Sequence, residues 1–143
     1  MNRNRVTVQH FVACIEARVV PPVGPHNFYD LLGVGYKHMV PPDAEPPWEI
    51  DLLDHFVRFV SGVGKAEFEI ELVWLDAPEG RRRIDFFGPY TVAFRPTDQI
   101  RDTMFRIRRV PLDGAGRYRF RLWQIQPRRR RLGTEFIHVS RSP

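Results

Sequence analysis

The chain has 143 residues, of which 43% are hydrophobic and 27% charged, and its formal net charge is +5 at pH 7. These values predict a single domain over residues 1–143 with its own hydrophobic core, and they exclude an intrinsically disordered chain. The single cysteine, Cys14, excludes an intramolecular disulfide and a cysteine-rich zinc site. We expect residues 1–5 to be flexible. Neither a signal-peptide pattern nor an apolar run of membrane-spanning length follows them, so we expect a cytoplasmic protein with no membrane association.

The charges are unevenly distributed along the chain. Residues 1–100 contain 10 Lys or Arg and 14 Asp or Glu, whereas residues 101–143 contain 12 Arg and 3 Asp or Glu. Nearly all the cations are arginine, a bias that GC-rich codon usage also produces. Because the guanidinium fork suits phosphate and carboxylate equally well, the basic surplus does not by itself distinguish a nucleic acid from an acidic protein surface.

The first part of the chain predicts two strands and a loop. Residues 6–20 are apolar and rich in β-branched side chains, and the proline-rich stretch 21–25 ends this strand because proline cannot extend a ladder. Residues 27–40 form a second strand-like run, whose two internal glycines indicate a bulge or a close backbone approach. The four prolines of residues 41–47 then predict an extended loop that crosses between two sheets.

Residues 48–60 fit two periodicities. A helical stripe would contain Ile50, Leu53, Phe56, Val57 and Val60, whereas the alternation near the end of the segment fits a strand. The aromatic and β-branched content of that end favours the strand.

Two later segments, 65–76 and 116–125, alternate strictly between apolar and charged residues. Such alternation is typical of a strand with one buried face and one exposed face. The exposed faces would carry Glu67, Glu69 and Glu71 in the first segment and Arg117, Arg119 and Arg121 in the second. We expect these opposite charges to pair across strands. The buried faces would carry Trp74, Tyr118 and Phe120.

Three further strands complete the chain. They are predicted at residues 83–94, 102–110 and 133–140, with residues 126–131 as a long basic hairpin tip before the last one. The total is about eight strands of modest length with turn signals between them. We therefore predict an all-β fold: a two-layer antiparallel β-sandwich with an immunoglobulin- or C2-like layout.

Several structural motifs follow a recognisable order. They are two apolar residues, glycine and an apolar residue at residues 31–34, a proline-marked crossing at 41–42, a glycine-led alternating strand with an acidic turn at 64–80, and the pattern G-x-Y-x-F-x-L at 116–122. In this order they resemble a family of short, uncharacterised bacterial β-sandwich proteins, a domain-of-unknown-function family. The resemblance implies a bacterial β-sandwich protein and brings no activity, cofactor or catalytic residue.

The residue types that support catalysis or metal binding occur without the spacing that such chemistry needs. The histidines His10, His26, His38, His55 and His138 form no close pair with metal-ligand spacing. Cys14 lies among apolar neighbours, where a buried, unreactive thiol is expected. Asp51 and Asp54 would share one face only if their segment were helical. We therefore predict no catalytic residue, no metal and no cofactor.

The sharpest binding signal is the run of four arginines in the expected hairpin tip. The candidate binding residues are Arg119, Trp123, Arg128, Arg129, Arg130 and Arg131. Tryptophan and arginine are the residues most often found at interface hot spots. We therefore predict a non-enzymatic binding or assembly module that contacts a protein partner or a second copy of itself. The alternative is binding of nucleic acid or another polyanion by the same arginines, and a third hypothesis is an enzyme of unknown type.

Overall fold

The computed structural model describes residues 5–20, 28–34, 37–95 and 100–143, and the described part of the chain forms ten strands and no helix. The fold is therefore all-β, as predicted. The strands are β1 (Thr7–Cys14), β2 (Glu16–Val20), β3 (Phe28–Leu32), β4 (Lys37–Val40), β5 (Trp48–Ser61), β6 (Gly64–Trp74), β7 (Ile84–Phe94), β8 (Arg101–Leu112), β9 (Gly116–Gln126) and β10 (Arg130–Arg141).

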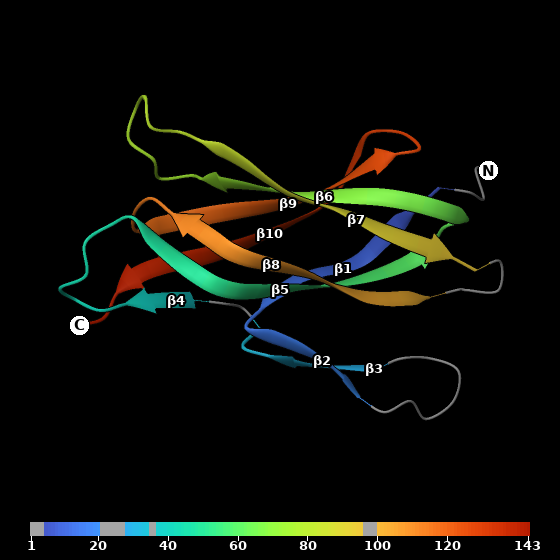
Figure 1. The fold of residues 1–143 in the computed structure, drawn as a ribbon, viewed down its shortest axis with the longest axis horizontal. Helices are drawn as coiled ribbons and strands as arrows, with labels where there is room; N and C mark the ends of the chain where they lie inside the picture. The colour runs from blue at the N-terminus through green and yellow to red at the C-terminus, as the bar shows by residue number, and fades with distance from the viewer. Residues whose placement is uncertain (1–4, 21–27, 35–36, 96–99) are drawn as a thin grey trace.

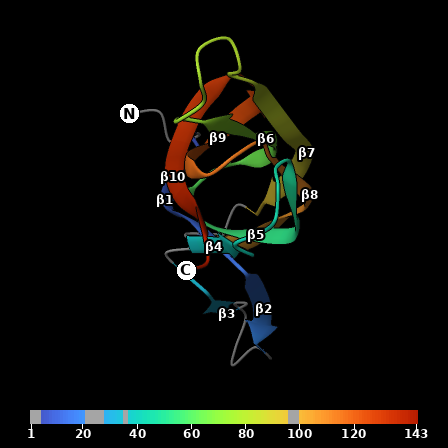
Figure 2. The same ribbon diagram turned by 90° about the vertical axis from the view of Figure 1, so that its left-hand side faces the viewer.

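Two sheets enclose one core. A three-stranded sheet has the order β1-β5-β8, and a five-stranded sheet has the order β4-β10-β9-β6-β7, in which only the β10–β4 pair is parallel. Figure 1 shows the two sheets facing each other, and Figure 2, a view along the strands, shows that they curl round a common interior. This arrangement establishes the all-β class but not the immunoglobulin- or C2-like layout.

Aromatic side chains from both sheets fill the interior. Phe59 of β5 packs on Phe68 of β6 with 4.9 Å between ring centroids, and Phe68 also contacts Phe105 of β8 at 5.8 Å. Tyr118 and Phe120 of β9 are buried, as the alternation predicted. Trp74 is half-buried and stacks on Tyr118 with 6.0 Å between ring centroids. Burial of this apolar surface is the main favourable contribution to folding.

The two strands expected at residues 6–20 and 27–40 are each divided into two. The chain leaves the three-stranded sheet at Ile15, whose amide donates to the carbonyl of Leu32 at 2.8 Å, and β2 then pairs with β3. This hairpin projects from the body of the molecule (Figure 2) and is called the arm below. The stretch 21–25, predicted as a strand end, lies outside the described residues, and so does Gly35.

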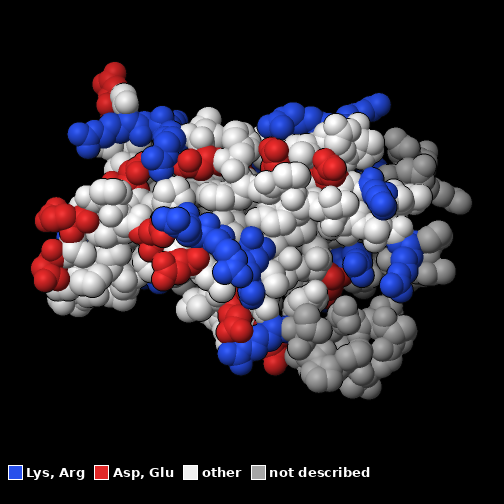
Figure 3. Space-filling view, in the orientation of Figure 1, with Lys and Arg blue, Asp and Glu red and all other residues white. Residues whose placement is uncertain are grey.

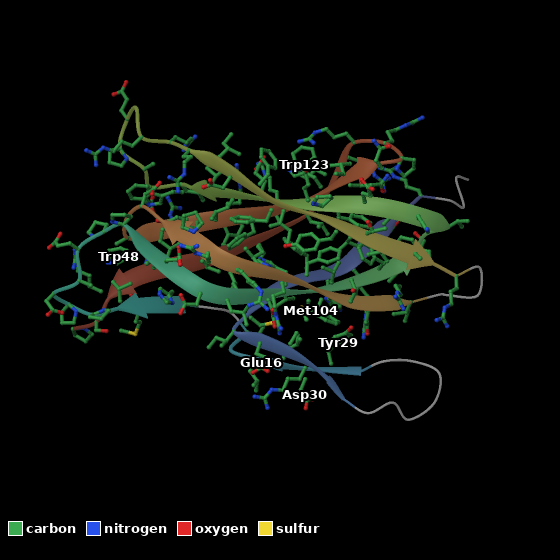
Figure 4. All side chains as sticks on the ribbon, viewed as in Figure 1. Glu16, Tyr29, Asp30, Trp48, Met104 and Trp123 are labelled. Carbon is green, nitrogen blue, oxygen red and sulfur yellow. The ribbon has the colours of Figure 1, made fainter. Side chains whose placement is uncertain are left out.

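The ambiguous segment 48–60 is a strand, as favoured, and its mixed periodicity has a structural cause. The arm covers the side of β5 that points away from the core, where Tyr29 packs on Phe56 with 5.5 Å between ring centroids. Figure 4 shows Tyr29 and Met104 between the arm and the body. Consecutive residues of β5 are therefore buried on both faces, which removes the simple alternation expected of a half-exposed strand.

Residues 41–47 connect β4 of the five-stranded sheet with β5 of the three-stranded sheet. The guanidinium of Arg141 donates to the carbonyl of Pro42 at 3.1 Å and lies over the ring of Trp48, 5.2 Å from its centroid. Trp48 is thus half-buried under a cation of its own chain. The described residues contain no helix long and apolar enough to span a membrane.

Candidate functional site: the outer face of the five-stranded sheet

Cross-strand register places several candidate residues on one surface. In antiparallel strands, residues directly opposite each other share a face. Arg119 of β9 lies opposite Phe136 of β10 and Val73 of β6, and Val73 in turn lies opposite Ile84 of β7. These four residues therefore form one row on the side of the sheet that faces away from the core.

A second row runs parallel to the first. Arg121 lies opposite Thr134 on one side and Glu71 on the other, and Glu71 lies opposite Phe86. A third, shorter row joins Arg131, Trp123 and Glu69. We call the residues of these three rows, with Arg129 above them, the outer face. Figure 4 shows Trp123 on the side of the sheet opposite β5 and β8.

Large apolar side chains are exposed on the outer face. Ile84 is 54% exposed, Phe86 48% and Phe136 54%. With strands ~4.8 Å apart, the surface from β10 to β7 spans roughly 15 Å. Single exposed apolar residues are ordinary, but several on one sheet face, interleaved with arginine, are typical of an interaction surface. The sequence reasoning missed these three residues because it assigned no inner and outer parity to the strands that carry them.

One buried carboxylate stands between two arginines at the centre of the outer face. Glu71 was expected in water but is only 7% exposed, because neighbouring strands and long side chains cover it. Its Oε1 lies 3.9 Å from a terminal guanidinium nitrogen of Arg119 and 3.9 Å from one of Arg121. These distances are ion pairs but too long for hydrogen bonds. Glu71 Oε1 and the Nε atoms of both arginines are buried without a hydrogen-bond partner.

Cations outnumber carboxylates around Arg119. Burial lowers the pKa of this arginine below its usual value, and the nearby positive charge of Arg121 lowers it further. Glu71 acts in the opposite direction, while Arg82 and Arg131 add to the lowering. The one buried carboxylate therefore does not balance the positive charge of the outer face. A hydrogen-bond acceptor supplied by a binding partner would stabilise this positive charge.

The expected pairing of three glutamates with three arginines is only partly correct. Glu71 meets Arg119 and Arg121, but Arg117 pairs instead with Asp76, at 2.9 Å between Nη2 and Oδ1. The hydrogen bonds from the Arg117 side chain and backbone lower the pKa of Asp76 to about 2. The reason is local: Asp76 lies two residues after the end of β6, and its carboxylate also accepts a hydrogen bond from the backbone amide of Arg117, near the start of β9.

The four-arginine run is not a single tip. The strands extend further than predicted, because Arg130 pairs with Gln124 and Arg131 with Trp123, so only residues 127–129 form the turn. Figure 3 shows basic side chains gathered over this β9–β10 hairpin at the upper right of the molecule. The expectation of a six-residue tip at 126–131 was therefore wrong in extent.

Alternate residues of the four-arginine run lie on two different surfaces. Arg129 lies over the Trp123 ring, 4.7 Å from its centroid, and 5.9 Å from the ring centroid of Phe86. Arg129 and Arg131 thus belong to the outer face with Trp123 and Arg119. Arg128 and Arg130 instead line a hollow at the end of the molecule. The structure therefore brings together four of the six predicted residues and places the other two elsewhere.

The buried polar groups form a structural cluster that links the arm to the body. Asp54 of β5 is fully buried, accepts two hydrogen bonds from Arg106 at 2.8 and 3.1 Å, and accepts one from the amide of Ala17 at 2.8 Å. The Cys14 thiol donates to the Asp54 carbonyl at 3.6 Å. Burial, followed by the charge of Asp54, raises the pKa of Cys14 to about 11, so this thiol is protonated at neutral pH.

Metal-ligating side chains do not converge in the described part of the chain. Among those residues, no set of three or more His, Cys, Asp or Glu side chains is arranged to hold a metal ion. Asp51 is exposed while Asp54 is buried, because the arm covers Asp54, whose carboxylate accepts a hydrogen bond from the Ala17 amide. His55 is fully buried between the rings of Phe11 and Phe120, at 5.1 and 4.5 Å between centroids.

Comparison with models of known protein families finds no family that matches the chain. Comparison with curated proteins finds no match either. The resemblance to an uncharacterised bacterial family therefore stays a prediction.

Proposed function

We propose that the protein is a non-enzymatic binding module whose outer face docks a protein partner with an acidic surface. The single observation that carries this proposal is the combination on that face of exposed Ile84, Phe86 and Phe136 with arginines that Glu71 balances only in part. Apolar anchors would contribute most of the affinity, and acceptors of the partner would contact the under-balanced arginines.

The mixed composition of the outer face favours a protein over a nucleic acid. Glu69 and Glu71 lie among the arginines and would repel phosphates. Arg129 lies over the Trp123 ring, 4.7 Å from its centroid, so a base would have to displace this side chain before it could stack on Trp123. The cation excess around Arg119 is the observation that favours the second candidate, polyanion binding.

The architecture that we propose for this role is a two-layer sandwich in which one sheet supplies the docking surface and the other supports it. The support for this layout is the shared core between the β1-β5-β8 sheet and the five-stranded sheet. A rigid sheet face presents side chains with little loss of conformational freedom on binding. A second copy of the chain is included among the partners of this proposal.

Co-purification with matched variants tests the proposal. The wild-type protein and the Phe86→Ser, Phe136→Ser and Met39→Ser variants would be expressed at equal levels and isolated from the same cells. Met39 is the control, because it is 48% exposed, as Phe86 is, but belongs to the edge strand β4. We expect a stoichiometric protein partner with wild type and Met39→Ser and its loss with Phe86→Ser and Phe136→Ser. The same retained proteins in all four samples would contradict the proposal.

Fluorescence anisotropy with a generic single-stranded oligonucleotide separates the second candidate. Polyanion binding would be strong at low salt, would fall steeply as salt rises, and would be lost in Arg129→Glu. That outcome would replace the protein-docking proposal. Light scattering of the purified protein at tens of micromolar concentration would show whether the partner is a second copy.

A further inference from the structure

A hollow at one end of the molecule lies apart from the outer face. It has a cavity volume of about 500 Å³. It lies where the start of β1, the turn between β5 and β6, and the β9–β10 hairpin meet, at the right-hand end of Figure 1. Its apolar wall includes Val6 and Ala66, and its size is within the range of pockets that hold small molecules.

Three arginines converge on this hollow from different segments. Arg5 precedes β1, Arg128 lies in the hairpin turn, and Arg130 begins β10. Within the residues that the structure describes, no carboxylate lies within ion-pair distance of any of the three. Like charges held together in this way repel one another, and an anion placed between them would relieve the repulsion.

The backbone and side-chain contacts hold these arginines in place. The Arg5 carbonyl accepts a hydrogen bond from the Ser61 hydroxyl at 2.5 Å, and the Arg130 guanidinium donates to the carbonyl of Val6. The Nε2 of Gln124 donates to the carbonyl of Arg128 at 3.0 Å, which fixes the hairpin turn above the hollow. These hydrogen bonds fix the backbone at Arg5 and Arg128 and the guanidinium of Arg130.

Gln124 supplies a second, independent sign of a ligand. This side chain lines the hollow, is only 5% exposed, and its Oε1 is buried without a hydrogen-bond donor. The Nε of Arg130 is likewise buried without an acceptor. A buried polar atom without a partner destabilises the folded chain unless something satisfies it. A ligand hydroxyl that reaches Gln124 Oε1 from the hollow would satisfy it.

We propose that the hollow binds a small phosphate monoester that carries a hydroxyl group, such as a sugar phosphate. The phosphate, with a charge of about −1.5 to −2 at neutral pH, contacts Arg5, Arg128 and Arg130 through paired N–H donors. The hydroxyl donates to Gln124 Oε1, and the apolar wall contacts the carbon skeleton. This site goes beyond the proposed docking function, because it uses the other two arginines of the run and the opposite side of the hairpin.

Isothermal titration calorimetry with ribose 5-phosphate, inorganic phosphate and ribose tests the assignment. We expect ribose 5-phosphate to bind wild type more tightly than inorganic phosphate does, and ribose to show no binding. Arg128→Gln should weaken ribose 5-phosphate binding by about ten-fold or more. Arg129→Gln is the matched control, since it removes the same charge from the adjacent residue on the other surface, and its affinity should stay within about two-fold of wild type.

The Gln124→Met variant tests the role of the amide. It should weaken ribose 5-phosphate binding by a larger factor than inorganic phosphate binding, because it removes the Oε1 acceptor as well as the Nε2 hydrogen bond to the Arg128 carbonyl. No binding of ribose 5-phosphate at millimolar concentration, or equal losses in Arg128→Gln and Arg129→Gln, would overturn the proposal. An oligonucleotide with a 5′-phosphate that binds more tightly than its unphosphorylated form and than ribose 5-phosphate would support the phosphate site and assign it to a nucleic-acid end.

Discussion

Replacing His55 with leucine should remove a specific source of acid sensitivity. Both nitrogens of this fully buried imidazole lack a hydrogen-bond partner, and its environment is aromatic. Burial lowers the pKa of His55 from 6.5 to about 3, against a smaller opposing effect of Asp54. Between these two pH values the unfolded chain binds a proton that the folded protein does not. Stability is therefore lost as the pH falls below 6.5.

The size of the effect follows from the two pKa values. Between pH 7 and pH 5, protonation of the unfolded state at this one residue costs ~2 kcal/mol of unfolding free energy. The assay is urea denaturation of wild type, His55→Leu and His10→Leu at both pH values, with unfolding monitored by intrinsic fluorescence. The exposed His10 is the control, and the effects of all other histidines cancel between variants.

We expect wild type and His10→Leu to lose ~2 kcal/mol more stability between pH 7 and pH 5 than His55→Leu does. At pH 7, His55→Leu should be at least as stable as wild type, because leucine leaves no unpaired nitrogen in the core. Equal losses for all three proteins would show that His55 is not buried and neutral in the folded state, and would refute the reasoning.

Two further predictions concern the buried Asp54–Arg106 pair and two glycines. Asp54→Asn should destabilise the protein by about 3 kcal/mol, since it breaks a buried pair with Arg106, whereas the exposed Asp51→Asn should change the unfolding free energy by less than about 0.5 kcal/mol; urea denaturation measures both, and equal effects would contradict the buried pair. Gly88→Ala should cost about 2 kcal/mol more than Gly80→Ala, because a Cβ at Gly88 would lie 2.9 Å from the Phe68 carbonyl oxygen while one at Gly80 meets nothing within 4 Å. Thermal melting compares this pair, and matched melting temperatures would argue against the close approach.

Strict alternation of apolar and charged residues predicted β6 and β9 well. Phe68, Ile70, Tyr118 and Phe120 are all in the core, as expected from a period of two. The same alternation misplaced Glu71, because a sequence pattern shows which face a residue occupies but not what its neighbours cover. Arg119 and Arg121 come from another strand, and no periodicity within β6 reports their contact with Glu71.

The arm was the largest feature that the sequence did not reveal. The strand breaks at Ile15, between β1 and β2. Because Ile15 is itself a β-branched apolar residue, its residue type does not signal the change of sheet. Once the arm covers β5, Asp54 and Phe56 become buried on the face opposite His55 and Val57. Burial of β5 by the arm depends on contacts between segments distant in sequence, and local β-propensity does not report such contacts.

The candidate site was predicted in part. Arg119, Trp123, Arg129 and Arg131 share the outer face, but the division of the arginine run between two surfaces required the register of β9 and β10. A one-residue shift of that register would exchange the two sets. The exposed Phe136 entered the site through the same register, because it lies opposite Arg119.

Site-specific photo-crosslinking tests the central claim most directly. A photoreactive phenylalanine analogue would replace Phe136 on the outer face or, as the control, Met39 on β4, and the cells would be irradiated. The account predicts a discrete protein adduct from position 136, little from position 39, and loss of the adduct when Arg131→Glu is added. Equal crosslinking from both positions, or an adduct with nucleic acid alone, would contradict the claim that the outer face docks a protein.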